Sequence, residues 1–336
     1  MLLDTPTLYY RAFFALPDSI TAPDGRPVNA VRGTLDFISH LVTHHRPDRL
    51  IACFDADWRP AFRVELLPSY KAHRVIEEAA PVSAAASAAP AASAQVGGKA
   101  EADIRAASAS VEEVPDTLSP QVEMLLEVLA AFGIPDGWAP GFEADDAIAA
   151  YAAGHRTEDG GPVDVVTGDR DMFQLISDKD GVRVFNIARG VAKLEVLGDT
   201  ELTAKYGVNG AQYADFATLR GDASDGLPGV AGIGEKTASA LLAEYGSLTA
   251  LLAAADDATS SVKPAIRKKL EAAVDYLAVA PRVVQVRADA PTTPVDSTLP
   301  TTPARPERLD ELAERYGLVN PVKRLTKALA AAGRTE

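Results

Sequence analysis

The chain has 336 residues, of which 47% are hydrophobic and 24% are charged, and its formal net charge at pH 7 is −14. This length and composition predict a globular protein with one large domain or two modest ones. No uninterrupted run of about 18 apolar residues occurs, and no basic segment is followed by an apolar one, so we expect a cytoplasmic protein without a membrane partner. The negative charge counts mildly against a nucleic-acid partner, because such proteins usually carry basic surfaces.

Apolar segments that run into carboxylates begin at the amino terminus. The segment LLD ends at Asp4, and after it the spacing of apolar residues in VNAVRGTLDFISHLVTHH predicts a helix. The next apolar segment, LIACF, predicts a strand and runs into Asp55. Cys53 in this strand is the only cysteine, which excludes an internal disulfide, and we expect it to be buried rather than nucleophilic.

A basic segment follows the second strand. In RPAFRVELLPSYKAHR, Arg59, Arg63, Lys71 and Arg74 lie close together, and Lys71 and Arg74 are one helical turn apart, so that both can face one phosphate. The Ala/Ser-rich insert from about residue 79 to 110 comes next. It has little bulky apolar surface and is interrupted by proline and glycine, so the sequence predicts a mobile loop there.

The pattern of helix and strand then repeats. SPQVEMLLEVLAAFG predicts a helix with proline near its start, and VDVVT predicts a strand that runs into Asp169 and Asp171. We expect Glu143 to begin the helix EADDAIAAYAAGH, which places Glu143, Asp145 and Asp146 in its first turn, where the helix dipole favours carboxylates. Glu143 and Asp146, three residues apart, share a face of this helix.

This alternation predicts an α/β fold with a mostly parallel sheet flanked by helices. Acids that follow the strands would then meet at the carboxyl ends of the sheet, where ligands bind in such folds. Crowded carboxylates repel one another unless cations compensate them, and oxygen ligands suit Mg²⁺ or Mn²⁺. The candidate metal ligands are Asp4, Asp55, Glu143, Asp145, Asp146, Asp169, Asp171, Asp222 and Asp225.

A glycine-rich hairpin lies in GLPGVAGIGEKTASALLAEYG. Gly229, Gly232 and Gly234 predict a tight turn before a helix from about Glu235 to Tyr245, whose first amides can bind phosphate. The segment differs from the nucleotide-binding P-loop motif at one residue, because Glu235 stands where the motif has its lysine. A helix-hairpin-helix that holds a DNA backbone fits this segment better. Its candidate DNA-binding residues are Gly229, Val230, Gly232, Ile233, Gly234, Lys236 and Thr237.

Read in order, LLDTPTLYYRAFFALP, FDADWRPAFRVELLPSYKAHR, GFEADDAIA, VVTGDRDMFQLIS and LRGDASDGLPGVAGIGEKTA resemble the successive motifs of the bacterial 5′ nucleases. These are flap endonucleases or 5′-3′ exonucleases, a family that also forms the amino-terminal domain of DNA polymerase I. The resemblance covers roughly residues 1–290, insert aside. It implies a free-standing, PIN-like nuclease, associated with the nucleoid, that hydrolyses DNA at nicks, 5′ flaps and free 5′ ends in replication and repair.

The resemblance also implies roles for particular residues. All nine candidate acids match the family's metal-binding positions, which implies two-metal-ion catalysis. Lys71 and Arg74 match active-site cations, Tyr70 matches a tyrosine that can stack on a base, and Arg59 and Arg63 belong to the basic DNA-contacting segment. The hairpin matches a helix-three-turn-helix, which in relatives can hold K⁺. We expect the protein to be a monomer.

The same resemblance divides the chain. We expect a nuclease core over residues 1–200, in which a helical arch over about 59–118 contains the insert, and a DNA-binding region over 201–289. The Pro/Thr-rich segment 290–306 predicts an extended surface linker, and 307–336 predicts two amphipathic helices.

Three alternatives stay open on the residues alone. A phosphatase of the haloacid dehalogenase type would use Asp55 and Asp57, but leaves the hairpin unexplained. A PIN-type ribonuclease shares the acidic core and normally lacks the hairpin. A catalytically silent protein that binds DNA structures gains nothing from so many carboxylates. Thr5-Pro6 departs from the usual first motif and brings a proline next to Asp4, and Gly226 stands where the family commonly has asparagine.

Overall fold

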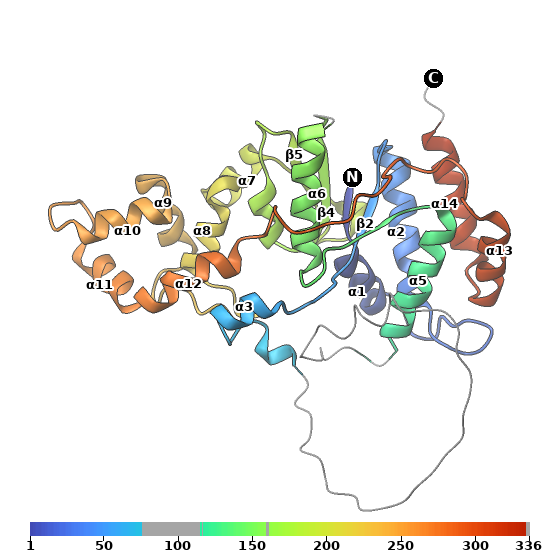
Figure 1. The fold of residues 1–336 in the computed structure, drawn as a ribbon, viewed down its shortest axis with the longest axis horizontal. Coiled ribbons are helices and arrows are strands. Elements are labelled where there is room, and N and C mark those ends of the chain that lie inside the picture. The colour runs from blue at the N-terminus through green and yellow to red at the C-terminus, as the bar shows by residue number, and fades with distance from the viewer. Residues whose placement is uncertain (76–114, 116, 159–160, 334–336) are drawn as a thin grey trace, which may run out of the picture.

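The structure, a computed structural model, describes residues 1–75, 115, 117–158 and 161–333. The predicted insert and most of the predicted arch lie outside these residues. Figure 1 shows an elongated molecule with a sheet in the middle, one group of helices at each end, and α3 (Ala61–Leu66) below the sheet. Among the described residues no single helix is long and apolar enough to cross a bilayer; the helices Glu235–Tyr245 and Leu248–Asp256 pass that test only as a pair bent by 80°.

The sheet has six strands in the order β3-β2-β1-β4-β5-β6. All neighbouring strands are parallel except β5 and β6, which confirms the mostly parallel sheet predicted from the sequence. The strands are β1 (Leu2–Asp4), β2 (Ile51–Cys53), β3 (Asp136–Gly137), β4 (Val163–Thr167), β5 (Val182–Asn186) and β6 (Glu195–Leu197). Cys53 is fully buried in β2, and burial raises the pKa of its thiol, as expected for a structural cysteine.

Helices cover both faces of the sheet because successive strand residues point to opposite sides. Leu3 packs into one hydrophobic cluster and Leu2 into another. The first cluster includes α1 (Thr5–Ala15), α2 (Asn29–His45) and α5 (Ser119–Phe132). The second includes α6 (Ala144–Glu158), the 3-10 helix η2 (Asp171–Leu175) and α7 (Asp199–Tyr206). A further 3-10 helix, η3 (Val191–Lys193), packs beside α2.

The second cluster continues into the helices that surround the hairpin. These are α8 (Gly210–Arg220), the 3-10 helix η4 (Ala223–Asp225), α9 (Glu235–Tyr245), α10 (Leu248–Asp256), α11 (Pro264–Ala272) and α12 (Val274–Val284). Val230 and Ile233 of the hairpin are buried in this cluster together with Val165 of the central strand β4. The hairpin is therefore held against the sheet by one continuous core. The short helices α3 (Ala61–Leu66) and η1 (Ala72–Arg74) carry the basic segment.

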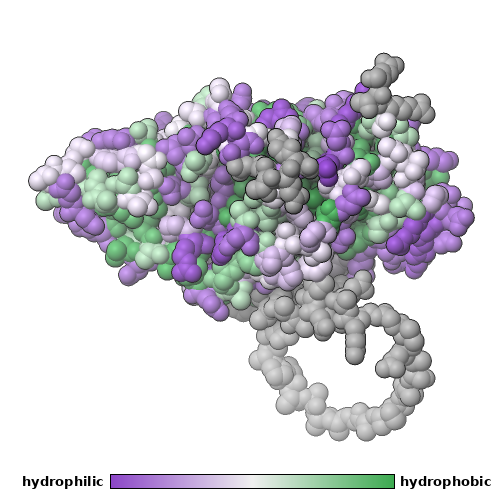
Figure 2. Space-filling model, turned by 45° about the horizontal axis from the view of Figure 1, so that its top comes forward, coloured by the Kyte–Doolittle hydropathy of each residue, from purple (hydrophilic) through white to green (hydrophobic). Residues whose placement is uncertain are grey.

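The segment 290–306, predicted to be an extended surface linker, is mostly exposed and is hydrogen-bonded to the core. Leu50 N donates to Ser297 O and Leu299 N donates to Asp48 O, and Leu299 is buried. The segment then runs to the two predicted helices, α13 (Pro306–Arg315) and α14 (Val319–Ala332). Helix α13 packs on α5, and α14 packs on α2 (Figure 1). Figure 2 shows a hydrophilic outer surface at the end formed by α13, as expected for an amphipathic helix.

Candidate active site

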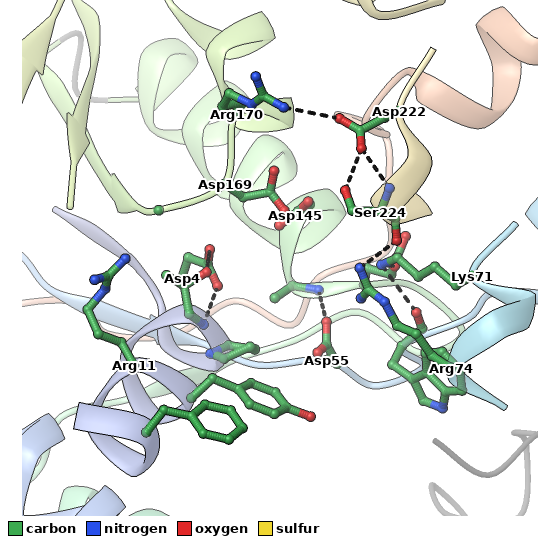
Figure 3. Close-up of a pocket in the computed structure, with 18 of the residues that line it drawn as sticks. Asp4, Arg11, Asp55, Lys71, Arg74, Asp145, Asp169, Arg170, Asp222 and Ser224 are labelled. Atoms are coloured by element: carbon green, nitrogen blue, oxygen red, sulfur yellow. Dashed lines mark hydrogen bonds and ion pairs between the residues drawn. The ribbon is translucent and has the colours of Figure 1, made fainter. Parts of the chain in front are cut away.

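A cavity of about 710 Å³ opens at the carboxyl ends of β1, β2 and β4 (Figure 3). Six of the nine predicted acids line it, and they come from five separate segments of the chain. These six are Asp4, Asp55, Glu143, Asp145, Asp169 and Asp222. Asp146, Asp171 and Asp225 do not line the cavity. Figure 3 shows Asp145 and Asp169 directed toward each other above Asp4 and Asp55. The fold therefore brings five acidic motifs, which are far apart in the sequence, together around one anionic cavity.

Asp4 ends β1 and caps the helix that follows. Its Oδ1 accepts from Thr7 N at 3.1 Å, and its Oδ2 accepts from the hydroxyls of Thr7 and Thr167, each at 2.5 Å. Pro6 fits this arrangement, because proline in the first helical turn removes an amide that needs no partner there. Burial raises the pKa of Asp4, the hydrogen bonds lower it, and the charge of Asp169 raises it further. Thr7 and Thr167 thus hold the Asp4 carboxylate in place, and Pro6 is compatible with this arrangement.

The surrounding protein offsets the negative charge of Asp55 and Asp145 only in part: Lys71 lowers the pKa of each, but burial outweighs it. Asp55 accepts from Ala144 N at 2.7 Å, and burial raises its pKa to about 7 although water in the cavity reaches its side chain. The pKa of Asp145 lies well above its usual value because of burial and the charges of Asp169 and Asp4. These groups favour protonation in the absence of a counter-charge.

Glu143, which borders the cavity, and Asp146, which does not, lie at the start of α6 and are neutralised by cations. Arg63 Nη1 donates to Glu143 Oε2 at 2.5 Å, and the Arg63 guanidinium binds both oxygens of Asp146 at 2.7 Å. Tyr70 donates its hydroxyl to Glu143 at 2.8 Å, and Lys71 Nζ also binds Glu143. Burial alone would raise the pKa of Glu143, but Lys71 and Arg63 outweigh it and lower that pKa.

Two side chains predicted to contact DNA are buried in this structure. The side chain of Arg63 is 2% exposed, and its Nε donates to Val283 O of α12 at 2.9 Å, so it joins three elements of the core and does not face a phosphate. Tyr70 is 4% exposed with its hydroxyl on Glu143, so its ring is not available to stack on a base. Asp146 is fully buried between Arg63 and the backbone amide of Arg287 and does not face the cavity as a metal ligand.

The turn from Ser69 to Arg74 is bonded to η4. Lys71 N donates to Asp225 O at 3.0 Å, and Arg74 Nη2 donates to Ser224 O at 2.8 Å and to Asp225 Oδ1 at 3.1 Å. Lys71 has φ of +49°, a strained value for a residue other than glycine. Gly226 has φ of +71°, and a Cβ there would stand 2.0 Å from Ser69 O, so no other residue fits. Lys71 and Arg74, both in the cavity lining, are thereby fixed relative to Asp225.

The remaining acids are held near the hairpin. The Asp222 side chain caps η4 by accepting a hydrogen bond from Ser224 N. Its Oδ2 forms ion pairs with Arg220 Nη2 at 3.1 Å and with Arg170 Nη2 at 3.7 Å. Burial and the charge of Asp169 raise the pKa of Asp171, which begins η2 and is not part of the cavity lining. The pKa of Asp225 is raised by burial, while Lys71 lowers it.

The hairpin exposes some of its predicted residues and buries others. Gly229 has φ of +67°, and a Cβ there would stand 2.6 Å from Gly221 N, so close backbone packing forms the turn. Gly232 O accepts from Lys269 Nζ at 2.8 Å. Lys236 and Gly234 are exposed, Thr237 is partly exposed, and Val230 and Ile233 are buried. Arg59 is occupied by the carbonyls of Tyr70 and Pro68, at 2.6 and 3.0 Å.

Sequence reasoning missed several residues of the cavity wall. Thr7, Tyr10, Arg11 and Phe14 of α1 all line the cavity. Their spacing is that of one helical face beginning just after Asp4, and this periodicity is the signal that could have found them. Trp58, three residues after Asp55, lines the cavity as well. Arg170 also lines it, beside Asp169.

The carboxylates form an open arrangement. Among the described residues no three histidine, cysteine or acidic side chains converge closely enough to form a ligand cage by themselves. Mg²⁺ usually keeps several waters and binds through one or two carboxylates, so an open set of oxygen ligands is compatible with such an ion.

Comparison with known proteins identifies the family. Residues 1–207 match the N-terminal resolvase-like domain of 5′-3′ exonucleases, and residues 208–307 match their C-terminal SAM fold. A 5′-3′ exonuclease of Streptomyces coelicolor is 52% identical over 331 residues, which is 98% of this chain and 100% of that protein. DNA polymerase I of Mycobacterium tuberculosis is 35% identical over the whole chain, which spans 32% of the polymerase.

Two solved structures have the same fold at low identity. The D15 protein of bacteriophage T5, co-crystallised with metal ions, has a TM-score of 0.61 at 18% identity and covers 99% of both chains. The catalytic core of Rad2 in complex with DNA substrate has a TM-score of 0.57 at 17% identity, over 99% of this chain and 92% of that one. The chain belongs to the 5′-3′ exonuclease family and is a 5′ nuclease.

Proposed function

We propose that the protein hydrolyses phosphodiester bonds of DNA at 5′ flaps, nicks and free 5′ ends, with two or more divalent ions, Mg²⁺ or Mn²⁺, in the cavity. One observation carries this proposal: carboxylates whose charge is offset only in part line one cavity together with the fixed cations Lys71 and Arg74. A phosphodiester brought against these acids requires compensating cations, because the acids alone would repel it.

The cavity residues fit such ions. Asp4, Asp55, Asp145, Asp169 and Asp222 would hold them, since each places carboxylate oxygens in the cavity lining. Burial and mutual repulsion raise the pKa of Asp55 and Asp145, as expected where positive charge is missing. When bound, divalent ions supply a hydroxide nucleophile near neutral pH and stabilise charge on the attacked phosphate.

The side chains of the protein orient the strand. Arg74 keeps 36% of its side chain exposed at the cavity, and Lys71, with 14% exposed, is aligned by Glu143. Figure 3 shows Arg11 on the far side of the carboxylates from Lys71 and Arg74. These cations would position the phosphates on either side of the scissile bond, because charge-assisted hydrogen bonds are strong and directional.

The hairpin would bind the duplex backbone. Its exposed Gly234 and Lys236 stand at the start of α9, where free amides and the helix dipole favour phosphate. Lys269, bonded to Gly232 O, brings an ammonium group to the same turn. We extend the proposal to one K⁺ ion bound by hairpin carbonyls; replacing K⁺ with Li⁺ at constant ionic strength would then weaken duplex binding.

The names of related structures support DNA as the partner. One T5 D15 structure is described as a flap endonuclease in complex with DNA and metal ions, and the Rad2 core was solved with DNA substrate. For this chain, 5′-flap specificity, a monomeric state and nucleoid association stay part of the proposal. Size-exclusion chromatography with light scattering tests the monomer, and microscopy of a fluorescent fusion tests the association.

A substrate panel tests the function. The purified protein is incubated with end-labelled 5′-flap, nicked, blunt-duplex, single-stranded and RNA substrates, with Mg²⁺, Mn²⁺ or EDTA. We expect metal-dependent cleavage at the flap junction and at 5′ ends of DNA, and none in EDTA. Preferential cleavage of RNA would favour the PIN-type ribonuclease, and cleavage of flaps in EDTA would exclude the metal assignment.

A further inference from the structure

Glu235 lies where an acid is unexpected. It is the first residue of α9, between Gly234 and Lys236, where the proposed function places a phosphate of the duplex. The side chain is 57% exposed, and its negative charge would repel this phosphate. Its carboxylate faces two arginines: Oε1 lies 3.5 Å from Arg220 Nη1 and 4.0 Å from Arg170 Nη1.

The same two arginines also bind Asp222. Arg220 Nη2 lies 3.1 Å from Asp222 Oδ2, and Arg170 Nη2 lies 3.7 Å from the same oxygen. Figure 3 shows this contact between Arg170 and Asp222 at the upper edge of the cavity. Each guanidinium group therefore bridges two acids, with one nitrogen near Asp222 and the other near Glu235. Two arginines and two acids form a cluster without net charge.

Asp222 connects this cluster to the cavity, which it lines together with Arg170. Both of its carboxylate oxygens are engaged, because Oδ1 accepts from Ser224 N at 3.0 Å and Oδ2 faces the arginines. A divalent ion near Oδ2 would be repelled by both guanidinium groups. A negative charge that draws these groups away from Asp222 therefore favours a cation at this oxygen.

Arg220 has one nitrogen that is free to respond to Glu235. Its side chain is 9% exposed, its Nε donates to Gly221 O at 3.0 Å, and the guanidinium carbon lies 5.3 Å from the centre of the Phe216 ring. Nη1 is buried and makes no hydrogen bond to any residue that the structure describes. Because a buried donor without a partner is unfavourable, Arg220 Nη1 is attracted to the nearby carboxylate of Glu235.

We propose that Glu235 is a positioning residue for Asp222: it offsets part of the charge of Arg170 and Arg220, and so strengthens cation binding at Asp222 while weakening duplex binding at the hairpin. The inference rests on the proposed function, because it requires a divalent ion in the cavity and a duplex on the hairpin. An acid at the start of a helix also stabilises the helix through its dipole. That structural role alone would leave the affinity for the cation unchanged.

Glu235→Gln keeps the size of the side chain and removes its charge. The arginines should then bind Asp222 more closely and weaken cation binding there, whereas a phosphate at the hairpin should bind more tightly. We expect Mn²⁺ affinity to fall and duplex affinity to rise, each by about 2- to 5-fold, since solvent screens the exposed carboxylate. Damage to the hairpin would instead weaken duplex binding.

Two binding measurements test this expectation. Mn²⁺ binding to the DNA-free protein is measured by isothermal titration calorimetry, and its reduction in Asp145→Asn assigns it to the cavity. Duplex binding is measured in EDTA by fluorescence anisotropy, with a duplex closed by a loop at each end, which has no 5′ end to cleave. Glu244→Gln is the matched control, because it removes the same charge near the other end of α9 and should leave both affinities unchanged. Equal shifts in Glu235→Gln and Glu244→Gln would overturn the proposal.

A second variant tests the path through the arginines. In the double variant Glu235→Gln/Arg170→Gln, one arginine remains for one acid, so that the cluster again has no net charge. Its Mn²⁺ affinity should return toward the wild-type value. If the double variant binds Mn²⁺ as weakly as Glu235→Gln does, the arginines do not connect Glu235 to Asp222 and the proposal is wrong.

The outcome separates this inference from the proposed function. If the wild-type protein neither binds Mn²⁺ in the cavity nor cleaves DNA in its presence, the proposed function fails. If the wild-type protein does both, and Glu235→Gln shifts the two affinities in the same direction or shifts neither, only the role of Glu235 fails.

Discussion

Acidic side chains near the start of α6 lie in two opposite electrostatic environments. Glu143, at the edge of the cavity, and Asp146, which is not part of its lining, are buried among Arg63, Tyr70 and Lys71 and are neutralised. On the cavity side, burial raises the pKa of Asp145, and repulsion from Asp169 and Asp4 raises it further. Acids in one motif therefore divide into a structural pair and a reactive set. The cations of the basic segment decide which acid belongs to which group.

The largest expected effect is on the reactive set. Replacing Asp145 or Asp169 with Asn should lower cleavage of a 5′-flap substrate by at least about 10²-fold, because several kcal/mol of charge stabilisation would be lost. Flap binding in EDTA should change little. Single-turnover kinetics measures the rate, and Asp36→Asn, which breaks a surface ion pair with Arg324, is the control. Full activity in either variant would refute the ligand assignment.

Changes to the network around Glu143 and Asp146 should lower the free energy of unfolding. Arg63→Leu removes one of the two cations bound to Glu143 and the ion-pair partner of buried Asp146, and should lower the free energy of unfolding by about 3–5 kcal/mol. Arg324→Leu removes an exposed ion pair and should cost about 1 kcal/mol or less. Denaturant titration compares the two. Adding Asp146→Asn to Arg63→Leu should restore part of the loss, and no restoration would contradict the network.

The contact between the turn from Ser69 to Arg74 and η4 depends on Gly226. Gly226→Ala should cost about 1–3 kcal/mol for its φ of +71°, and the collision with Ser69 O should displace Lys71 and reduce cleavage as well. Gly25→Ala is a matched control with φ of +88° and open space around it, so it isolates the backbone strain. If both variants cleave flaps at the wild-type rate, the turn does not position Lys71.

The raised pKa of Asp55 predicts that protein stability depends on pH and on divalent ions. The folded-state pKa of Asp55, about 7, exceeds its ordinary value of 3.8, so its contribution to stability is present below about pH 4 and is lost as the pH rises through 7. Divalent ions should offset this loss. We therefore expect Mg²⁺ to raise the melting temperature by a few degrees at pH 8 and by less at pH 5. Asp55→Asn should reduce this difference, and an equal Mg²⁺ effect at both pH values would contradict it.

The smallest effect is expected from the Ala/Ser-rich insert. Arg74 is bonded to η4 on one side of it, and Gln121 Oε1 accepts from Ala30 N on the other, so both flanks are held without the insert. Loop closure changes by only about 0.6 kcal/mol for each doubling of loop length. Deleting residues 80–110 should thus leave the melting temperature nearly unchanged, whereas failure to fold would show that the insert is structural.

Much of this site was predictable from local patterns. Apolar segments that end in acids correctly located Asp4, Asp55 and Asp169 at the carboxyl ends of strands, because strand direction and sheet topology are coupled. The glycine spacing of the hairpin correctly predicted the start of α9 at Glu235.

The roles of the basic residues were less predictable. Arg63 and Tyr70 lie in the same short motif as Lys71 and Arg74, yet they point into the core. Their direction depends on Glu143, about 80 residues away, and on Val283, 220 residues away. The wall formed by Thr7, Tyr10, Arg11 and Phe14 was visible as a helical face, but only the fold shows that this face meets the acids.

The burial of Cys53 has a practical consequence for labelling chemistry. It is the only thiol of the chain, it is fully buried in β2, and its raised pKa keeps it protonated and unreactive toward maleimides. The natural protein is therefore a ready background for single-cysteine probes. Dyes or spin labels placed on the exposed hairpin and on α1 would report how the two ends of a bound strand move, without removing any native residue of the core.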